Sequence, residues 1–425
     1  MKHNSKRLSV GPIILMIGLA SFLIATDLKA VVGQDGTADL KTWPGFRGAV
    51  RDGHAANFPA KPFRPRMLWS FALPSQGVGG VAASHDFVVV SARTDNDTKD
   101  YFACLDPTTG AELWTLVYPA PGSLDYGNSP RSTPQLVDPH VFLLGAFGDL
   151  HCVNLDSGEI EWNKHLVRDM AGRLPNWGFG WSPLAYDEKL YVLPGGPSNS
   201  AACLAQNDGH VLWQSPGPVS AYSSPQIADW KGTRQLVAFD KESIVGWDFV
   251  DGKRRWSVTP TAKGDFNVPT PILLEDGLMT LSENNGARIY RIDDQGRLMA
   301  DPVAARDKPA PDAQSPVRVG NLVISAEREL TAMRLDMKLE TAWTVRDRSL
   351  RNHNSLIVGG NQMLVITQGG EILLVDVTDS AGTIRARHKF GSEAGYVLAH
   401  PALCDEVLYL RTEHSLQAWA LWAAE

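Results

Sequence analysis

The sequence predicts an all-β protein, an eight-bladed β-propeller of four-stranded blades in which the N- and C-terminal strands close the ring. Two observations lead to this fold class. A glycine–tryptophan pattern recurs every 43 to 51 residues, and short apolar strands led by proline recur with it. A repeat of this length, built of strands and turns, is typical of propeller blades or solenoid units. Residues 66–425 divided among eight blades give 45 residues each, which matches the observed spacing.

The first 30 residues have the layout of a secretory signal peptide. Lys2, Lys6 and Arg7 precede an apolar run at residues 10–25, and the segment ends at Ala30. Basic residues, a short apolar run and small residues in this order are typical of such peptides. An uncleaved N-terminal membrane anchor is the alternative, although the run is short for a spanning helix. We therefore expect a periplasmic or secreted protein with no membrane span beyond a possible anchor at this end.

The charge of the chain bears on its partners. The formal net charge is −7, and loss of residues 1–30, which hold four basic residues and one acidic residue, would make it −10. An acidic surface without a basic run repels phosphate backbones, so we expect no nucleic-acid partner. The expected partner is an envelope protein or a small-molecule ligand, and the protein is expected to be a monomer.

Residues 31–65 are predicted to form an N-terminal extension ahead of the propeller. The extension contains the motif WPGFRGAVRDG at residues 43–53. Arg47, Arg51 and Asp52 within this motif could anchor the segment through ion pairs, or they could be solvated.

The recurring pattern places a glycine four residues before each of four tryptophans and a small residue ten residues before it. The tryptophans are Trp114, Trp162, Trp213 and Trp256, the glycines are Gly110, Gly158, Gly209 and Gly252, and the small residues are Cys104, Cys152, Cys203 and Gly246. Because glycine has no Cβ, a large flat ring can lie directly on its peptide, and the small residue leaves room for that ring. We expect the tryptophans to dock on the neighbouring sheet and to hold the blades together.

The cysteines follow the same repeat. Cys104, Cys152 and Cys203 occupy equivalent positions in successive units, and Cys404 in the last unit has no obvious mate. Facing sheets lie about 10 Å apart, whereas bridged cysteines need Cα atoms within about 7 Å of each other. The cysteines are therefore predicted to be buried free thiols that fill space.

Proline-led segments are predicted to form the innermost strand of each blade. The clearest are STPQLV (132–137), WSPLAY (181–186), SSPQIA (223–228), PTPILL (269–274) and QSPVRV (314–319). Proline suits the first position of a strand, where no ladder hydrogen bond has to be donated. Two weaker copies and the first unit bring the number of inner strands to eight. The tryptophan pattern is incomplete in the later units, so the blade boundaries after residue 260 stay open.

The last unit lacks an outer strand. The segment RMLWSFAL at residues 66–73 resembles the outer strand AELWTLVY and stands before the first inner strand. Closing a ring with strands from both ends of the chain removes the exposed sheet edges. Residues 66–425 are therefore predicted to form one closed propeller.

These motifs resemble those of a known family. The pattern in CLDPTTGAELW resembles the tryptophan-docking motif of quinoprotein-type, or PQQ-like, eight-bladed propellers, and WPGFRGAVRDG is similar to the opening of secreted PQQ-like repeat proteins. The resemblance covers residues 43–425. It implies the propeller fold, but it implies no single function, because the family includes PQQ-dependent alcohol dehydrogenases and the accessory lipoprotein of the outer-membrane β-barrel assembly machine.

The resemblance leaves the cofactor and the activity open. The dehydrogenases of this family hold PQQ between a tryptophan and a disulfide of adjacent cysteines, beside a Ca²⁺ ion. This sequence has no adjacent cysteine pair, and no catalytic residue can be assigned. We expect a non-catalytic binding or protein-interaction scaffold with no assigned cofactor. A PQQ- and Ca²⁺-dependent alcohol dehydrogenase is the alternative. A third hypothesis is an assembly factor that binds unfolded strands or partner loops on its rim.

The segments that precede the inner strands are predicted to cluster at one mouth of the central channel. They are rich in aromatic and polar residues, as in LDYGNSPR (124–131), PNWGFGW (175–181) and GDFNVP (264–269). The predicted ligand site combines an apolar platform with polar contacts around it: Trp177, Phe179, Trp181 and Tyr222, with Asn267, Arg351, His353 and His400. Concave sites on rigid scaffolds have this character. The competing prediction is that these aromatic side chains plug the channel.

No metal site is predicted. Glu283 and Asn284 in the segment SENNG could bind Ca²⁺ through oxygen ligands, but a turn between two strands accounts for the same residues. Single histidines such as His151 and His210 lack the spacing of a ligand set.

Overall fold

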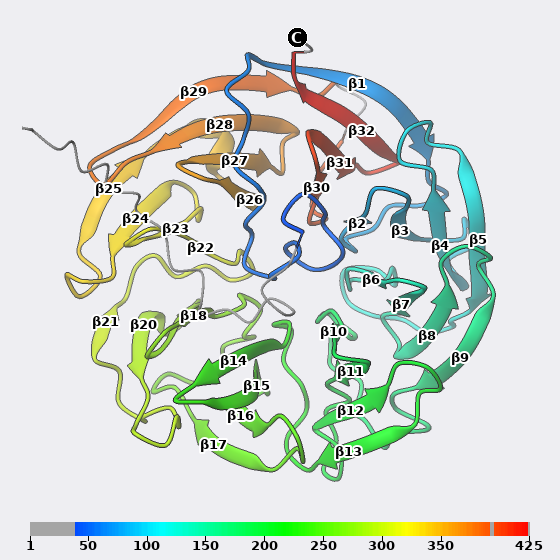
Figure 1. Cartoon of the computed structure of the whole chain (residues 1–425), viewed down its shortest axis with the longest axis horizontal. Helices are drawn as coiled ribbons and strands as arrows, with labels where there is room; N and C mark the ends of the chain where they lie inside the picture. Colours follow the sequence, from blue (N-terminus) through cyan, green and yellow to red (C-terminus); the bar gives the residue numbers. More distant parts are fainter. Residues whose placement is uncertain (1–38, 392–394, 424–425) are drawn as a thin grey trace, which may run out of the picture.

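Eight four-stranded antiparallel sheets follow one another around a central axis in the computed structural model, which describes residues 39–391 and 395–423 (Figure 1). The predicted all-β fold class and the number of blades are therefore confirmed. The predicted signal peptide or anchor at residues 1–30 lies outside the described residues. Within the described ranges, no helix has the length and apolar character needed to cross a membrane.

The strands of each blade run in sequence order from the axis to the rim, apart from the last blade. In blades 1 to 4 they are β2 Ala82–Ala83, β3 Val88–Arg93, β4 Lys99–Leu105 and β5 Glu112–Pro119; β6 Gln135–Val137, β7 His140–Leu144, β8 Asp149–Asn154 and β9 Ile160–His165; β10 Leu184–Tyr186, β11 Lys189–Val192, β12 Ala201–Ala205 and β13 Val211–Ser215; β14 Gln226–Trp230, β15 Thr233–Phe239, β16 Ile244–Asp248 and β17 Arg254–Val258.

Blades 5 to 8 repeat this arrangement, and a 3-10 turn, Arg348–Leu350, precedes blade 7. The strands are β18 Ile272–Leu274, β19 Gly277–Ser282, β20 Gly286–Arg291 and β21 Ala304–Arg306; β22 Val317–Val319, β23 Leu322–Ser325, β24 Leu330–Arg334 and β25 Thr341–Val345; β26 Asn354–Gly359, β27 Gln362–Thr367, β28 Glu371–Val377 and β29 Gly382–Lys389; β30 Ala402–Cys404, β31 Val407–Arg411, β32 Ser415–Trp422 and β1 Phe63–Ala72.

The first and last strands close the ring as predicted. Strand β1 pairs antiparallel with β32, and Ser70 lies opposite Gln417. The strand begins at Phe63, three residues before the predicted segment, and thereby supplies the outer strand that blade 8 lacks (Figure 1).

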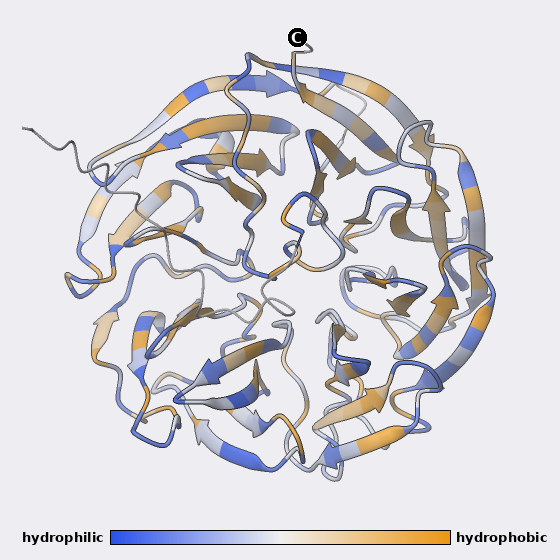
Figure 2. Cartoon of the chain, viewed as in Figure 1, coloured by the Kyte–Doolittle hydropathy of each residue, from blue (hydrophilic) through white to orange (hydrophobic). Residues whose placement is uncertain are grey.

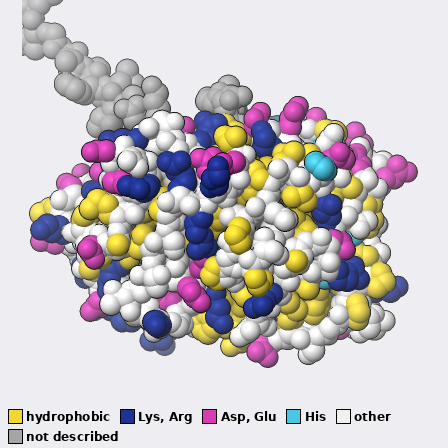
Figure 3. Space-filling model, turned by 90° about the horizontal axis from the view of Figure 1, so that it is seen from below, with side chains coloured by type: hydrophobic (Ala, Val, Ile, Leu, Met, Phe, Trp, Pro, Cys, Tyr) yellow, Lys and Arg dark blue, Asp and Glu magenta, His cyan; other side chains and the backbone are white. Residues whose placement is uncertain are grey.

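The position of a strand in its blade determines its burial. Strand β3 is buried along its whole length, whereas the rim strand β29 alternates between half-buried and exposed residues. A strand covered on both faces needs continuous apolar side chains, and a rim strand needs them on one face only. Figure 2 shows this change from apolar inner strands to mixed outer strands. Seen edge-on, the disc carries interspersed acidic, basic and hydrophobic side chains (Figure 3).

The repeated tryptophans dock between blades. The ring of Trp114 in blade 1 lies against Gly158 in blade 2, where a Cβ would lie 2.6 Å from its Cγ. The receiving glycine therefore belongs to the following blade, not to the repeat that contains the tryptophan. The same contact joins four other pairs: Trp69 and Gly110, Trp162 and Gly209, Trp213 and Gly252, and Trp343 and Gly382. Trp256 is different, because its ring packs near Trp230 of its own blade.

The small residue ten positions earlier lies directly opposite each tryptophan on the neighbouring strand. Cys104 pairs with Trp114, and Gly246 pairs with Trp256. A Cβ at Gly246 would lie 2.2 Å from the indole, so the predicted need for a small residue is confirmed at this position. All four cysteines are buried and free, as predicted.

The N-terminal extension crosses the central channel. Its residues bond to the inner strands of two separate blades, 2 and 7: Leu136 N–H donates to Pro44 O at 2.7 Å, and Ala55 N–H donates to Val358 O at 2.8 Å. The extension lies in the middle of the ring in Figure 1. Arg51, between these contacts, donates to Gln135 Oε1 at 2.9 Å. The irregular segment therefore ties blades 2 and 7 together across the axis.

The arginines of the extension are anchored mainly by carbonyl groups. Arg47 is 4% exposed and donates to Asp52 O at 2.8 Å and to Pro316 O at 2.5 Å. Arg51 donates further hydrogen bonds to Ser182 O and Pro183 O, at 3.0 and 2.9 Å. Anchoring, rather than solvation, is therefore the role of both arginines, and most of their hydrogen bonds go to backbone oxygens and not to ion-pair partners.

A chain of hydroxyl groups links consecutive blades around the channel. In four blades, the hydroxyl residue immediately before the strand-leading proline accepts a hydrogen bond from the matching peptide N–H of the preceding blade. The bonds run from Thr133 to Ser182, Ser182 to Ser224, Ser224 to Thr270 and Thr270 to Ser315, at 2.9 to 3.3 Å. This explains why serine or threonine precedes those prolines, a feature of the sequence that the proline pattern alone did not interpret.

Candidate functional site

One face of the disc carries all the connections from the outer strand of one blade to the inner strand of the next. Each blade has four antiparallel strands, so its outer strand ends on the face where its inner strand began. Every inner strand therefore begins on the same face. We call this face the loop face. It holds the segments that the sequence predicts to form a ligand site.

An aromatic cluster projects from the loop face around Trp177. The centroid of its ring lies 5.0 Å from that of Tyr222, 4.2 Å from that of Phe266 and 5.7 Å from that of Tyr126. Tyr126 is 86% exposed and Phe266 is 45% exposed. Large exposed aromatic side chains that contact one another are typical of binding surfaces. We call these four residues the aromatic cluster.

A pocket of about 610 Å³ opens beside this cluster. Tyr222 and Phe266 line it together with Ser220 and Asn267 from the same two loops. The Oγ of Ser220 and the Oδ1 of Asn267 are buried and have no hydrogen-bond partner among the described residues. An unpaired buried polar atom costs about 1–3 kcal/mol, so two polar groups of the pocket wall are left without compensation in the described structure.

The backbone of the pocket is held by the blade 5 turn. Asp265 accepts hydrogen bonds from Ser282 Oγ at 2.6 Å and from Asn284 N at 2.7 Å. Glu283 Oε1 accepts a hydrogen bond from Phe266 N at 2.7 Å, and burial raises the pKa of Glu283. In the described structure, the SENNG segment therefore supports the pocket loop through these bonds.

Charges of both signs surround the pocket. Its lining includes Lys241 and Lys263 together with Glu242 and Asp265. A wall of balanced charge does not select a strongly acidic or strongly basic ligand. The pocket therefore suits a ligand with apolar and neutral polar groups.

The structure separates the predicted platform residues. Trp177 and Tyr222 lie in the aromatic cluster, but Phe179 and Trp181 are fully buried in the core around blades 2 to 4. Phe179 lies beside Gly148, where a Cβ would lie 2.8 Å from its ring. The two residues pack edge to face and therefore support the loop from below.

The predicted polar residues divide among three places. Asn267 lines the pocket described above, whereas Arg351 and His353 line a separate pocket of about 370 Å³ that also includes Gln368. His400 contacts Phe46 of the extension, with ring centroids 5.2 Å apart. Burial, with the positive charge of Arg47 nearby, lowers the pKa of His400 to about 4, so this histidine is neutral at pH 7.

The channel contains the extension and not the aromatic cluster. Phe46 is 8% exposed and lies against His400 of blade 8 within the ring, whereas Tyr126 and Phe266 are exposed. The competing prediction, in which the mouth aromatics plug the channel, therefore does not describe these residues. A closed ring of this size is filled here by a segment whose sequence has no strand pattern.

Sequence reasoning missed three residues of this site. Tyr126 and Phe266 stand in loop segments noted for their aromatic content, and each precedes or follows a turn-forming residue. Ser220 begins another of the segments predicted at the channel mouth, SAYSSP (220–225), but nothing in the sequence distinguishes it from the other serines there. An exposed aromatic next to glycine or asparagine in a loop before an inner strand is the signal that could have identified the first two.

Comparison with known families shows which family the chain belongs to. The sequence model of a family described as outer membrane protein assembly factor BamB matches residues 98–317, more than half of the chain. The chain belongs to the PQQ-like propeller family. This confirms the resemblance noted in the docking motifs.

Several solved structures share the fold of this chain. BamB from Moraxella catarrhalis is 15% identical, with a TM-score of 0.59 over 84% of this chain and 100% of its own. Quinohemoprotein alcohol dehydrogenase from Comamonas testosteroni is 13% identical, with a TM-score of 0.67 over 91% and 82%. The computationally designed Ika8 protein is 13% identical, with a TM-score of 0.58 over 84% and 100%. These identities show the fold alone. No curated protein matches the chain in sequence.

Proposed function

We propose that the protein is a non-catalytic binding scaffold of the cell envelope that holds an extended segment of a partner protein on its loop face. The observation that carries this proposal is the exposed aromatic cluster next to a pocket with two unpaired buried polar atoms. A rigid scaffold with apolar anchors and a few fixed polar groups is the usual design of a recognition site.

The chemistry of the site favours a peptide. The aromatic cluster offers flat apolar contact for side chains. Asn267 Oδ1 has no partner in the part of the chain that the structure describes, and an amide oxygen can accept a hydrogen bond of the kind that a peptide N–H donates. Ser220 Oγ can donate to a peptide carbonyl. The balanced charge of the lining removes the reason to expect a polyanion.

Membership of the family also supports a protein partner. BamB is described as an outer membrane protein assembly factor, a protein that acts on other proteins. A periplasmic or secreted location, a cleaved or anchoring segment at residues 1–30, and a monomeric state complete the proposal. The order of residues in the N-terminal segment supports the location.

The alternative is a PQQ-dependent alcohol dehydrogenase. The similarity to the fold of a quinohemoprotein alcohol dehydrogenase favours it. However, the residues do not match the PQQ site that the family resemblance implies. The four cysteines are free, buried and distant in sequence, so an adjacent pair is missing, and the extension with Phe46 and Arg51 crosses the channel.

Site-specific photo-crosslinking in the cell envelope tests the proposal. A photoreactive amino acid is placed at Tyr126, 86% exposed in the aromatic cluster, or at Val250, 84% exposed in a turn on the opposite face. We expect a discrete crosslinked protein from position 126, on the proposed binding face, and none from position 250. Position 250 is the matched control, because the two positions are about equally exposed. Equal products from both positions, or no product from either, would contradict a loop-face binding site.

A cofactor assay separates the alternative. The purified chain is mixed with PQQ and Ca²⁺, and dye-linked oxidation of alcohols is measured. We expect no activity above that of PQQ and Ca²⁺ alone. Activity that appears only in the reconstituted protein would replace the scaffold by an oxidoreductase.

A further inference from the structure

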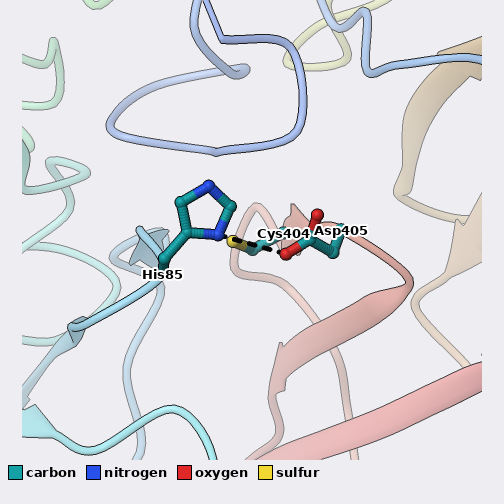
Figure 4. A group of neighbouring side chains, drawn as sticks. All are labelled: His85, Cys404 and Asp405. Carbon is teal, nitrogen blue, oxygen red and sulfur yellow. Dashed lines mark hydrogen bonds and ion pairs between the residues drawn. The ribbon is translucent and has the colours of Figure 1, made fainter.

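A second group of reactive side chains lies on the face opposite the loop face, where the ring closes. His85 stands in the turn between β2 and β3 of blade 1, and Cys404 and Asp405 stand at the end of β30 in blade 8. In Figure 4 the three side chains point toward one another from the two blades. One nitrogen, one sulfur and one carboxylate oxygen of this group lie within 4.8 Å of one another.

The geometry of the group is close to that of a metal site. His85 Nδ1 and Asp405 Oδ2 are hydrogen-bonded to each other at 3.1 Å. Tetrahedral zinc, with bonds of about 2.0–2.3 Å, holds its ligand atoms roughly 3–4 Å apart, so the nitrogen–oxygen pair already has this separation. The Cys404 sulfur lies within 4.8 Å of both atoms.

An independent contact orients the histidine. Asp39 Oδ2 lies 3.1 Å from His85 Nε2, on the side of the ring away from Asp405. Histidines that bind metals usually donate their other ring N–H to a carboxylate, which fixes the tautomer and the direction of the free nitrogen. Asp39 therefore holds Nδ1 toward Cys404 and Asp405.

The backbone around the group is also fixed. Asp405 N–H donates to Lys41 O at 2.6 Å, and Trp43 forms a bridge with Ala83 directly before the His85 turn. The extension, blade 1 and blade 8 thus meet at this point. A bound ion would connect all three across the seam of the ring.

The sulfur of Cys404 distinguishes this group from a similar one in blade 2. His140, Cys152 and Glu161 also lie close together, but Cys152 Sγ donates to Gln206 O at 3.7 Å. Cys404 is 4% exposed, and no hydrogen bond of its thiol is found within residues 39–391 and 395–423. In the same ranges, His140 has an acidic partner at Nδ1 only.

We propose that His85 Nδ1, Cys404 Sγ and the Asp405 carboxylate form a zinc site that staples blade 8 to blade 1, with Asp39 as a positioning residue. Sulfur and nitrogen ligands favour zinc over calcium or magnesium. Binding displaces the thiol proton of Cys404 and the Nδ1 proton of His85 to solvent. Water can take the fourth position, because His85 and Asp405 are about half exposed.

Zinc titration of the full chain tests the site. The protein, without a histidine tag, is stripped with a chelator, and zinc affinity and stoichiometry are measured by calorimetry and elemental analysis. We expect one zinc per chain at this site and at least a tenfold loss of affinity in Cys404→Ser and in His85→Ala. The matched control Cys152→Ser, in the blade 2 group, should leave the affinity unchanged.

Two further readouts separate ligation from a structural effect. Cobalt bound in place of zinc should show a thiolate-to-cobalt absorption band that Cys404→Ser removes and Cys152→Ser keeps. Zinc should raise the unfolding temperature of the unchanged chain and not that of Cys404→Ser. Asp405→Asn keeps the shape of the side chain and should also weaken zinc binding. It serves as the test variant if Cys404→Ser fails to fold. Absence of zinc binding, or equal affinity in the unchanged chain and in Cys404→Ser or Asp405→Asn, would overturn the proposal.

Discussion

The indole of Trp114 in blade 1 lies on Gly158 of blade 2, and its Nε1 donates to Leu155 O at 2.7 Å. One side chain therefore joins two sheets by ring contact and by a hydrogen bond. Gly158 has φ +72, a conformation that other residues adopt with strain. The repeated glycine and tryptophan of the sequence are the residues that make this contact between adjacent blades.

Replacement of the receiving glycine should loosen the ring. Gly158→Ala introduces a Cβ that would lie 2.6 Å from Trp114, in addition to the backbone strain. Gly232→Ala is the matched control, because Gly232 also has φ +72 but has nothing within 4 Å. We expect Gly158→Ala to lower the free energy of unfolding by about 1–3 kcal/mol more than Gly232→Ala, as overpacking does. Equal losses in denaturant unfolding would mean that the docked indole adds little.

Removal of the Arg51 side chain should release the extension. Gln135 Oε1, Ser182 O and Pro183 O would lose their donor in Arg51→Ala. Each hydrogen bond to a charged group contributes about 1.5–3 kcal/mol, so the loss of three should cost roughly 5 kcal/mol or more and speed proteolysis within residues 39–62. Arg64→Ala, at an exposed position of β1, is the control and should change neither measurement. Unchanged proteolysis of Arg51→Ala would show that the segment is held by other contacts.

Stability should decrease with falling pH through His151. This side chain is 7% exposed, and burial lowers its pKa to about 4, below the value near 6.5 of an unfolded histidine. The unfolded chain therefore takes up the proton first. The stability contribution is complete above pH 6.5 and is lost as the pH falls toward 4, at about 1.4 kcal/mol per pH unit.

A variant isolates this histidine from other titrating groups. Burial raises the pKa of Asp100 to about 6, so this carboxyl acts in the opposite direction and loses its contribution as the pH rises through 6. The measurement is therefore the difference between the unchanged chain and His151→Gln. From pH 7 to pH 4.5 the unchanged chain should lose about 2 kcal/mol more. Parallel pH profiles would contradict a neutral buried His151.

The sequence predicts the parts of the fold that repeat. Eight inner strands and the closure by β1 follow from a periodic pattern, because each blade must bury the same faces. The sequence does not show which glycine contacts each tryptophan, because that contact depends on how neighbouring blades pack together. Gly382 illustrates this: it stands outside the regular spacing, yet it receives Trp343.

The site was predictable only in part. Trp177, Phe179 and Trp181 stand in one loop with similar surroundings in sequence, yet only Trp177 joins the exposed cluster. Alternation within an irregular loop carries no rule for which side chain faces the core. His85 and Asp405 are 320 residues apart, so no local spacing could reveal their contact.

Binding on the loop face is the central claim, and the yield of the crosslink from position 126 in a Trp177→Ala background tests it most directly. Tyr396→Ala is the control, because Tyr396 is also an aromatic residue of the loop face, 62% exposed, but stands outside the aromatic cluster. Trp177→Ala should reduce the yield at least tenfold, because it removes the ring that the other three contact, whereas Tyr396→Ala should preserve it. An undiminished yield in Trp177→Ala would contradict the aromatic cluster as the partner site.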